Sequence, residues 1–177
     1  MKKLWKKICL GLVALTMASQ AHALILIEPY LGYDFSLSGD SNGEDLDFSG
    51  FGYGARLGLQ LSMIMFGVSY DILDLDVEPA SGGEVSFEQT NLGIFAGWNP
   101  KGEGIRFWAT YFIDSNGDAD APEDEEGDGF ALGIGWKFKP WLAANLEYRS
   151  YSFDKPAGTD MGLDSLFITV SFPIDLL

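Results

Sequence analysis

Residues 130–139 read Phe-Ala-Leu-Gly-Ile-Gly-Trp-Lys-Phe-Lys, so that large apolar side chains alternate with glycine, alanine and lysine. A period of two predicts a β-strand with two unlike faces. A strand of a soluble sandwich turns its second face to water and has little use for glycine there. A strand of a small membrane barrel turns its apolar face to lipid and fills a narrow interior with small and polar groups. The stretch therefore favours a barrel strand whose glycine-and-lysine face looks inward.

The first 23 residues predict a secretory signal peptide. Four lysines between positions 2 and 7 precede an apolar run over residues 8–17, and Ala21-His22-Ala23 fits the small-x-small cleavage rule. A membrane-anchoring helix is disfavoured because the apolar run is short and polar residues follow it. We expect cleavage after Ala23 and a single domain over residues 24–177.

Removal of this leader changes the net charge and the residue types that remain. Seven basic residues remain against 26 acidic ones, so the formal charge falls from −15 to −19, and the only cysteine and only histidine, Cys9 and His22, are lost. This excludes a disulfide, a Cys/His zinc site, a cysteine nucleophile and a histidine base. The negative charge argues against nucleic acid as a partner. Residues 24–177 contain no run of about 18 apolar residues, which excludes a spanning helix and leaves a closed barrel as the way across a membrane.

Eight segments of the chain share the alternating pattern. They are residues 25–37, 48–61, 64–72, 90–98, 105–114, 130–139, 142–149 and 166–172. Their connections are alternately long and short, and the long ones are polar loops at residues 39–47, 74–84, 115–128 and 154–163. An even strand number with alternately short and long connections is typical of outer-membrane barrels. We therefore predict an all-β fold, an eight-stranded antiparallel up-and-down transmembrane β-barrel.

Two segments depart from a simple alternation. In residues 105–114 both faces are apolar, and we place Arg106 inward, with Asp114 on the same face, because a charge facing the bilayer midplane costs about 2–4 kcal/mol. Val85 and Phe87 fall on the inward parity of their strand, so we expect a bulge near Glu88 or an extension beyond the apolar zone. Aromatic residues near both ends of the strands predict two membrane-interface belts: Trp98, Trp136 and Phe138 beside the short turns, and Tyr33, Tyr70 and Tyr148 toward the long loops.

This pattern resembles the small eight-stranded outer-membrane barrels of the OmpA and OmpX type. The resemblance covers nearly all of residues 24–177 and rests on pattern rather than on a motif. It implies a location in the outer membrane, in contact with its lipid and lipopolysaccharide. It also implies the barrel-assembly machinery and periplasmic chaperones as partners during biogenesis. Such barrels usually end in an aromatic residue, whereas here Pro173-Ile174-Asp175-Leu176-Leu177 follows Phe172.

The inward faces carry an unusual number of charges. The predicted lumen charge network consists of Glu28, Asp34, Arg56, Asp71, Arg106, Lys137, Glu147 and Arg149, with Gln60, Asn91 and Lys139 beside it. We expect Arg56 and Arg149 to be hubs, since a guanidinium pairs bidentately with carboxylates. We also expect Lys137 to meet inward carboxylates such as Glu147 on the next strand. The network either plugs the lumen, which is just wide enough for side chains to fill, or forms a narrow polar path that conducts.

The loop at residues 115–128 is strongly acidic. Its spacing of oxygen ligands resembles a calcium loop in Asp114, Asn116, Asp118, Asp120 and Glu125. Ala119 stands where such a loop needs glycine, and no helices flank it, so the alternative is a solvated acidic loop. We expect no cofactor beyond a weakly bound divalent cation at this loop.

These observations predict an integral outer-membrane barrel with a mostly plugged polar lumen. Its role would be structural or a surface interaction through the loops, with an unknown external partner. One alternative is a small pore for ions or small solutes. Another is a secreted, lipocalin-like soluble binding barrel, which would leave the glycine-rich faces in water. An enzyme is not expected, because lipid A acyltransferases and deacylases of similar barrel fold rely on histidine, which residues 24–177 lack.

Overall fold

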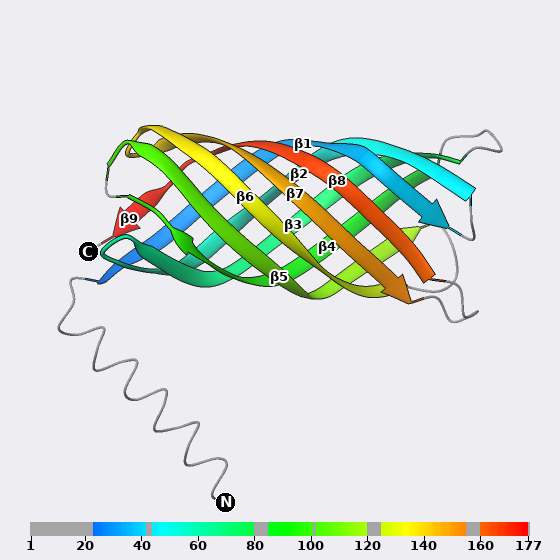
Figure 1. Cartoon of the computed structure of the whole chain (residues 1–177), viewed down its shortest axis with the longest axis horizontal. Coiled ribbons are helices and arrows are strands. Elements are labelled where there is room, and N and C mark those ends of the chain that lie inside the picture. Colours follow the sequence, from blue (N-terminus) through cyan, green and yellow to red (C-terminus); the bar gives the residue numbers. More distant parts are fainter. Residues whose placement is uncertain are drawn as a thin grey trace, which may run out of the picture.

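The computed structural model describes residues 23–41, 44–79, 85–100, 102–119, 125–154 and 160–176. The strands are β1 (Ala23–Ser41), β2 (Glu44–Leu61), β3 (Ile64–Pro79), β4 (Val85–Trp98), β5 (Gly104–Ala119), β6 (Glu125–Lys139), β7 (Leu142–Asp154), β8 (Asp160–Ser171) and β9 (Ile174–Leu176). From β1 to β8 the neighbours in sequence pair antiparallel, and β1 also pairs with β8 and β9 on its other edge, which closes the sheet (Figure 1). The predicted eight-stranded up-and-down barrel is confirmed. The signal peptide prediction falls on residues 1–22, outside the described part, and on the first residue of β1.

None of the described residues belongs to a helix that is long and apolar enough to cross a membrane.

The strands extend further than the sequence predicts. β1 has 19 residues and β8 has 12, whereas about 9–11 suffice to cross a bilayer. The excess lies at the ends that the long loops join: β3 continues to Pro79 and β5 to Ala119. The four long loops are therefore shorter than predicted, because the hydrogen-bonded ladder continues into them.

The polarity of the two strand faces inverts along β3. In its first half Tyr70 points outward and Asp71 is buried in the interior; in its second half Leu73 is buried and Asp74 points outward. A wall that faces lipid needs apolar groups outside, whereas a wall that faces water needs them inside. The inversion therefore marks where the barrel leaves the membrane.

The same inversion explains the parity of Phe87. Phe87 is buried inside the barrel, Glu88 points outward, and the pairing of β3 with β4 runs without interruption past both. The predicted bulge near Glu88 is therefore wrong, and the other expectation, an extension beyond the apolar zone, is confirmed.

A bulge does occur on β5. Leu92 pairs with Asp114 but Gly93 pairs with Phe112, so Ile113 is an extra residue on β5. Beyond it the parity shifts: Asp114 is exposed and Ser115 is buried. The prediction that Asp114 faces inward is wrong for this reason, whereas Arg106, before the bulge, faces inward as predicted.

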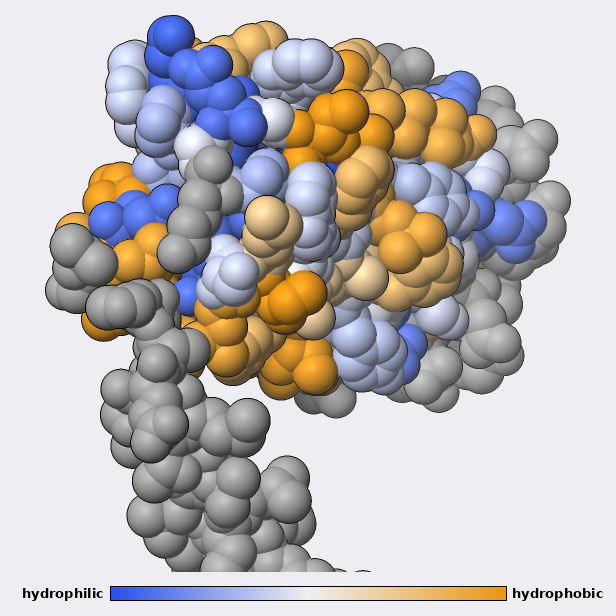
Figure 2. Space-filling model, turned by 60° about the vertical axis from the view of Figure 1, so that its left-hand side comes forward, coloured by the Kyte–Doolittle hydropathy of each residue, from blue (hydrophilic) through white to orange (hydrophobic). Residues whose placement is uncertain are grey.

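An apolar belt surrounds the outside of the barrel. Phe51 is 69% exposed and Leu132 is 55% exposed, and hydrophobic side chains cover much of the visible wall in Figure 2. The predicted interface aromatics all lie on the outward parity. The Tyr33 hydroxyl lies 3.0 Å from Ser49 Oγ, and the Tyr148 hydroxyl donates to Asp164 Oδ1 at 3.0 Å. An amphipathic ring with its hydroxyl turned to a polar neighbour is typical of a membrane interface.

The residues after Phe172 extend the barrel wall. Phe172-Pro173 interrupts the last strand, and β9 then pairs Ile174–Leu176 with residues 25–27 of β1. The backbone N–H of Phe172 donates to the carbonyl of Pro29 at 2.9 Å. β9 lies beside the beginning of β1 at one end of the barrel (Figure 1). The residues after Phe172 thus cover a part of the β1 edge that β8 does not reach.

Candidate functional site

A chain of alternating charges crosses the barrel interior. In order of contact it consists of Arg106, Glu28, Arg56, Glu147, Arg149 and Asp71. These six side chains are at most 2% exposed and come from β5, β1, β2, β7 and β3. Three positive and three negative groups alternate, so each interior member touches two of opposite sign. Buried charges are tolerable only when they are paired in this way.

Glu28 joins the first two arginines. Arg106 Nη1 donates to Glu28 Oε2 at 2.8 Å, and Arg106 Nη2 donates to Glu28 Oε1. Arg56 Nη1 donates to the same Oε1 at 3.3 Å. The pairing with Arg106 is bidentate, the geometry that gives a guanidinium its strongest contact with a carboxylate.

Glu147 continues the chain from Arg56 to Arg149. Arg56 Nη2 donates to Glu147 Oε1, and Arg149 Nη2 donates to Glu147 Oε2 at 3.4 Å. Arg149 Nη1 then donates to Asp71 Oδ1 at 3.2 Å. Arg56 and Arg149 each contact two carboxylates, the position that the sequence assigned to them as hubs.

Aromatic rings hold the guanidinium groups in place. The Arg56 guanidinium lies 4.6 Å from the ring centres of both Tyr30 and Trp108. Arg149 lies 4.0 Å from the ring centre of Phe167. Cation–π contacts strengthen when the cation is desolvated, so the rings stabilise the arginines in the positions that the carboxylates require.

Neutral polar groups complete the network at its two ends. Asp71 accepts hydrogen bonds from the Tyr30 hydroxyl at 2.9 Å and from Asn91 Nδ2 at 2.8 Å. Arg106 Nη2 donates to Asn145 Oδ1 at 2.7 Å. Asp71 and Arg106, at the two ends of the chain of charges, therefore have hydrogen-bond partners in addition to their ion pairs. Buried charges need such additional partners.

Three predicted lumen residues lie apart from this chain of alternating charges. Asp34 is buried on β1, but no ion pair joins it to the rest of the described chain. Lys137 is buried near the short turns, where its Nζ donates to the carbonyl of Pro100 at 3.5 Å. Lys139 is outside the lumen: it is 60% exposed and pairs with Glu103 at 3.2 Å. The placement of Lys139 in the lumen is therefore wrong.

The predicted contact between Lys137 and Glu147 is also wrong. The pairing of β6 with β7 sets Lys137 opposite Ala143 and Glu147 opposite Gly133. The two charges are thus separated along the strands, and Glu147 instead meets arginines that reach across the lumen.

The outer part of the lumen is apolar, which the sequence reading missed. Its side chains are those of Tyr30, Phe48, Leu73, Leu75, Phe87, Phe112, Ala131, Tyr151, Phe153, Leu163 and Phe167. A smaller cluster of Leu26, Met65, Phe95 and Trp108 lies near the short-turn ends of β1, β3, β4 and β5. The signal was available: Leu73 and Leu75 continue the inward parity of Asp71 into a segment taken for a loop.

Glycine on the inward faces makes room for this filling. A Cβ at Gly133 would lie 2.1 Å from the Trp108 ring, and a Cβ at Gly135 would lie 2.3 Å from Asn145 Oδ1 and 2.9 Å from Arg106 Nε. The glycines of the opening stretch therefore leave the space that the large side chains of β5 and β7 occupy.

The acidic loop is described only in part. Asp114 and Asn116 are exposed on extended β5, and Asn116 Nδ2 donates to Asp114 Oδ1 at 3.0 Å. The side chains of Asp118, Asp120 and Glu125 lie outside the described part. Within the described part, no three His, Cys, Asp or Glu side chains are grouped so that they could hold a metal. The calcium hypothesis therefore stays a prediction.

Known structures share this fold. Neisserial surface protein A is 13% identical, covers 84% of this chain and 96% of its own, and superposes with a TM-score of 0.54. Ail, the attachment invasion locus protein of Yersinia pestis, is also 13% identical, covers 84% of this chain and 98% of its own, and superposes with a TM-score of 0.54. The structure of Ail in complex with the heparin analogue sucrose octasulfate is 11% identical, covers 85% of this chain and 99% of its own, and has a TM-score of 0.50. No curated protein matches the chain. The outer membrane protein β-barrel domain family matches residues 8–172, and the chain belongs to that family.

Proposed function

We propose that this outer-membrane barrel is closed to solutes and acts through the end that carries its long connections. The observation that supports closure is the buried chain of alternating charges from Arg106 to Asp71, with an apolar cluster filling the outer lumen beyond it. An ion that passed this chain would have to separate buried ion pairs. Breaking one such pair costs about 3–5 kcal/mol.

Conductance in planar bilayers tests the closure. Barrels whose insertion is verified by heat-modifiable migration are expected to give no unitary currents at any applied voltage. The double variant Arg149→Ser, Phe112→Ser removes one charge from the chain and one ring from the outer cluster, and it should raise the current above this baseline. Unitary currents from the unmodified barrel would overturn the proposal.

A small pore is the second candidate, and one observation favours it. Asp34, Ser115 and Ser165 are buried, and their side-chain oxygens have no hydrogen-bond partner among the described residues. Polar groups of this kind would suit a hydrated path beside the ion pairs. The same bilayer experiment decides between the two candidates.

The charge of the long connections indicates the kind of partner. Residues 39–47, 74–84, 115–128 and 154–163, which comprise these connections and the strand ends beside them, contain 17 of the 26 acidic residues and one basic residue, Lys155. Ail has been solved with a polyanion bound, but a rim of this charge would repel one. We therefore propose a cationic partner, either a basic protein surface or divalent ions that link the rim to lipopolysaccharide phosphates.

Binding of charged polymers to the barrel in lipid vesicles tests this part. Polylysine is expected to bind, and its affinity should fall as salt is raised, because exposed charges are screened beyond about 10 Å at 0.1 M. A heparin-type polyanion is expected not to bind. Binding of the polyanion with equal or higher affinity would contradict the proposal.

Catalysis has no place in this proposal. The interior carboxylates Glu28, Glu147 and Asp71 are buried and accept hydrogen bonds from arginines, so they are engaged in the chain of charges rather than free to contact a substrate. We further propose that residues 1–23 direct export and that the assembly machinery inserts the chain.

A further inference from the structure

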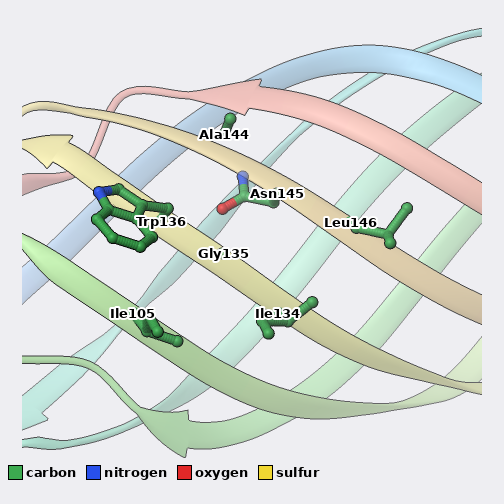
Figure 3. A pocket seen from close by; sticks show the side chains of 7 residues that line it. All are labelled: Ile105, Ile134, Gly135, Trp136, Ala144, Asn145 and Leu146. Carbon is green, nitrogen blue, oxygen red and sulfur yellow. The ribbon is translucent and has the colours of Figure 1, made fainter.

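The outer wall of the barrel carries an apolar groove between β5, β6 and β7. It encloses about 280 Å³ and is lined by Ile105, Ile134, Gly135, Trp136, Ala144, Asn145 and Leu146 (Figure 3). Gly135 and Asn145 belong to the inward parity, so the groove meets them from the side of their backbone. Ala144, which pairs with Trp136, is the smallest of the outward side chains that line the groove.

The groove lies on the lipid-facing wall close to the short turns. Trp136 precedes Lys139, the last residue of β6, by three positions, which is about 10 Å along a strand. Short turns of outer-membrane barrels face the periplasm, so the groove opens to the inner leaflet, where phospholipid acyl chains are the available hydrocarbon. A groove left empty would forfeit dispersion contacts along its whole lining.

An exposed ion pair lies beyond the groove on the turn side, two residues from Ile105 and three from Trp136. The register sets Ile105 opposite Trp136 and Gly104 opposite Lys137, so Glu103 and Lys139 follow next toward the turns. Lys139 Nζ lies 3.2 Å from Glu103 Oε1, and the two side chains are 60% and 57% exposed. Such a pair contributes little stability by itself, and each of its charges has room for another partner.

The charges of this pair complement a zwitterionic headgroup. An ammonium group suits Glu103, and a phosphate suits Lys139. In Figure 3 the indole nitrogen of Trp136 is on the side of its ring toward the end of β6, where a headgroup would lie. The apolar lining and the paired charges thus match the two parts of one lipid molecule.

We propose that the groove and the Glu103–Lys139 pair together bind one phospholipid whose headgroup carries a phosphate and a primary ammonium. One acyl chain fills the groove, Lys139 holds the phosphate, and Glu103 accepts hydrogen bonds from the ammonium. The headgroup supplies the selectivity, since hydrocarbon in the groove and hydrocarbon in the bilayer are equally apolar.

A second groove on the wall shows the contrast. It encloses about 370 Å³ over Ala96 and Ala109 and is bordered by Tyr111 and Phe130. The Tyr111 hydroxyl donates to Asp128 Oδ2 at 2.9 Å, so the charge near this groove is negative. It lacks the paired charges that a zwitterionic headgroup would match, and the proposal is confined to the first groove.

Native mass spectrometry of the purified, delipidated mature protein in detergent tests the site. The probes are phosphatidylethanolamine, phosphatidylcholine, which has no N–H to donate to Glu103, and phosphatidylglycerol, which has no ammonium. Phosphatidylethanolamine is expected to bind with 1:1 stoichiometry and about tenfold more tightly than the other two, the difference that one charge-assisted hydrogen bond makes. Equal binding of all three lipids would overturn the proposal.

Matched variants locate the lipid. Ala144→Leu places a larger side chain in the lining of the groove and is expected to weaken phosphatidylethanolamine binding about tenfold. Ala55→Leu adds the same side chain on the outward face of β2, between Pro29 and Tyr70, and should leave binding unchanged. Glu103→Gln is expected to abolish the preference over phosphatidylcholine. Heat-modifiable migration verifies that each variant is folded. Undiminished binding by folded Ala144→Leu would contradict the assigned groove.

Discussion

Replacing Arg56 by methionine is expected to destabilise the barrel strongly. Arg56 contacts both Glu28 and Glu147. Glu28 would retain its bidentate partner Arg106, but Glu147 would keep only Arg149 at 3.4 Å. One carboxylate would thus remain buried with a single long contact, a situation that costs about 3–5 kcal/mol of unfolding free energy. The lost ring contacts of the guanidinium add about 1 kcal/mol or more.

A compensating change separates the buried charge from other effects. In the double variant Arg56→Met, Glu147→Gln the uncompensated carboxylate is gone, while the pairs Arg106–Glu28 and Arg149–Asp71 remain. Its cost should be smaller than that of Arg56→Met alone, which corresponds to a coupling of about 2 kcal/mol between the two positions.

Urea titration of the barrel in lipid vesicles, followed by tryptophan fluorescence and by migration on unheated gels, gives the unfolding free energies. Lys139→Met is the control, because the exposed Lys139–Glu103 pair is expected to contribute about 0–1 kcal/mol. The reasoning is refuted if Arg56→Met unfolds within 1 kcal/mol of the unmodified barrel, the margin of an exposed pair. It is also refuted if the double variant is no more stable than the single one.

Three other predictions follow from the fold. Gly133→Ala should lower stability by about 1–3 kcal/mol in the same urea titration, since its Cβ would meet the Trp108 ring at 2.1 Å; in a Trp108→Ala background the same change should cost less, and no loss in the single variant would contradict the close packing. Truncation after Phe172 exposes the edge of β1 at residues 25–27 and should increase aggregation on refolding, measured by light scattering; unchanged scattering would show that β9 does not protect this edge. Calorimetric titration of calcium into the barrel should detect weak binding at millimolar concentration that Asp114→Asn reduces, and the absence of heat would remove the calcium hypothesis.

The barrel was predictable because its alternation repeats in every strand. Each strand has one face toward lipid and one toward a narrow interior, so Phe51, Leu132 and Arg56 had their directions set by parity alone. Parity fails where an extra residue enters, and the bulge at Ile113 reversed the direction of Asp114 for that reason. The residues before Ile113 carry no pattern that predicts this extra residue of β5.

The sequence predicted which charged residues face the lumen better than it predicted which of them contact each other. Which inward charges meet depends on the stagger between strands and on the reach of long side chains across the barrel. Glu147 and Lys137 lie on adjacent strands, yet Glu147 meets Arg56, which lies 91 positions away in the chain. The apolar outer cluster was missed for a different reason: residues around Leu73 and Phe87 kept their parity while the solvent outside changed from lipid to water.

The inversion of polarity also divides the forces that hold the wall together. Around Leu73 and Phe87 apolar groups leave water on folding, so the hydrophobic effect stabilises the outer half and weakens on cooling. Around Glu28 and Arg56 the outside is hydrocarbon, so hydrogen bonds and ion pairs supply the cohesion instead. The outer half should therefore loosen first in the cold, before the section inside the membrane does.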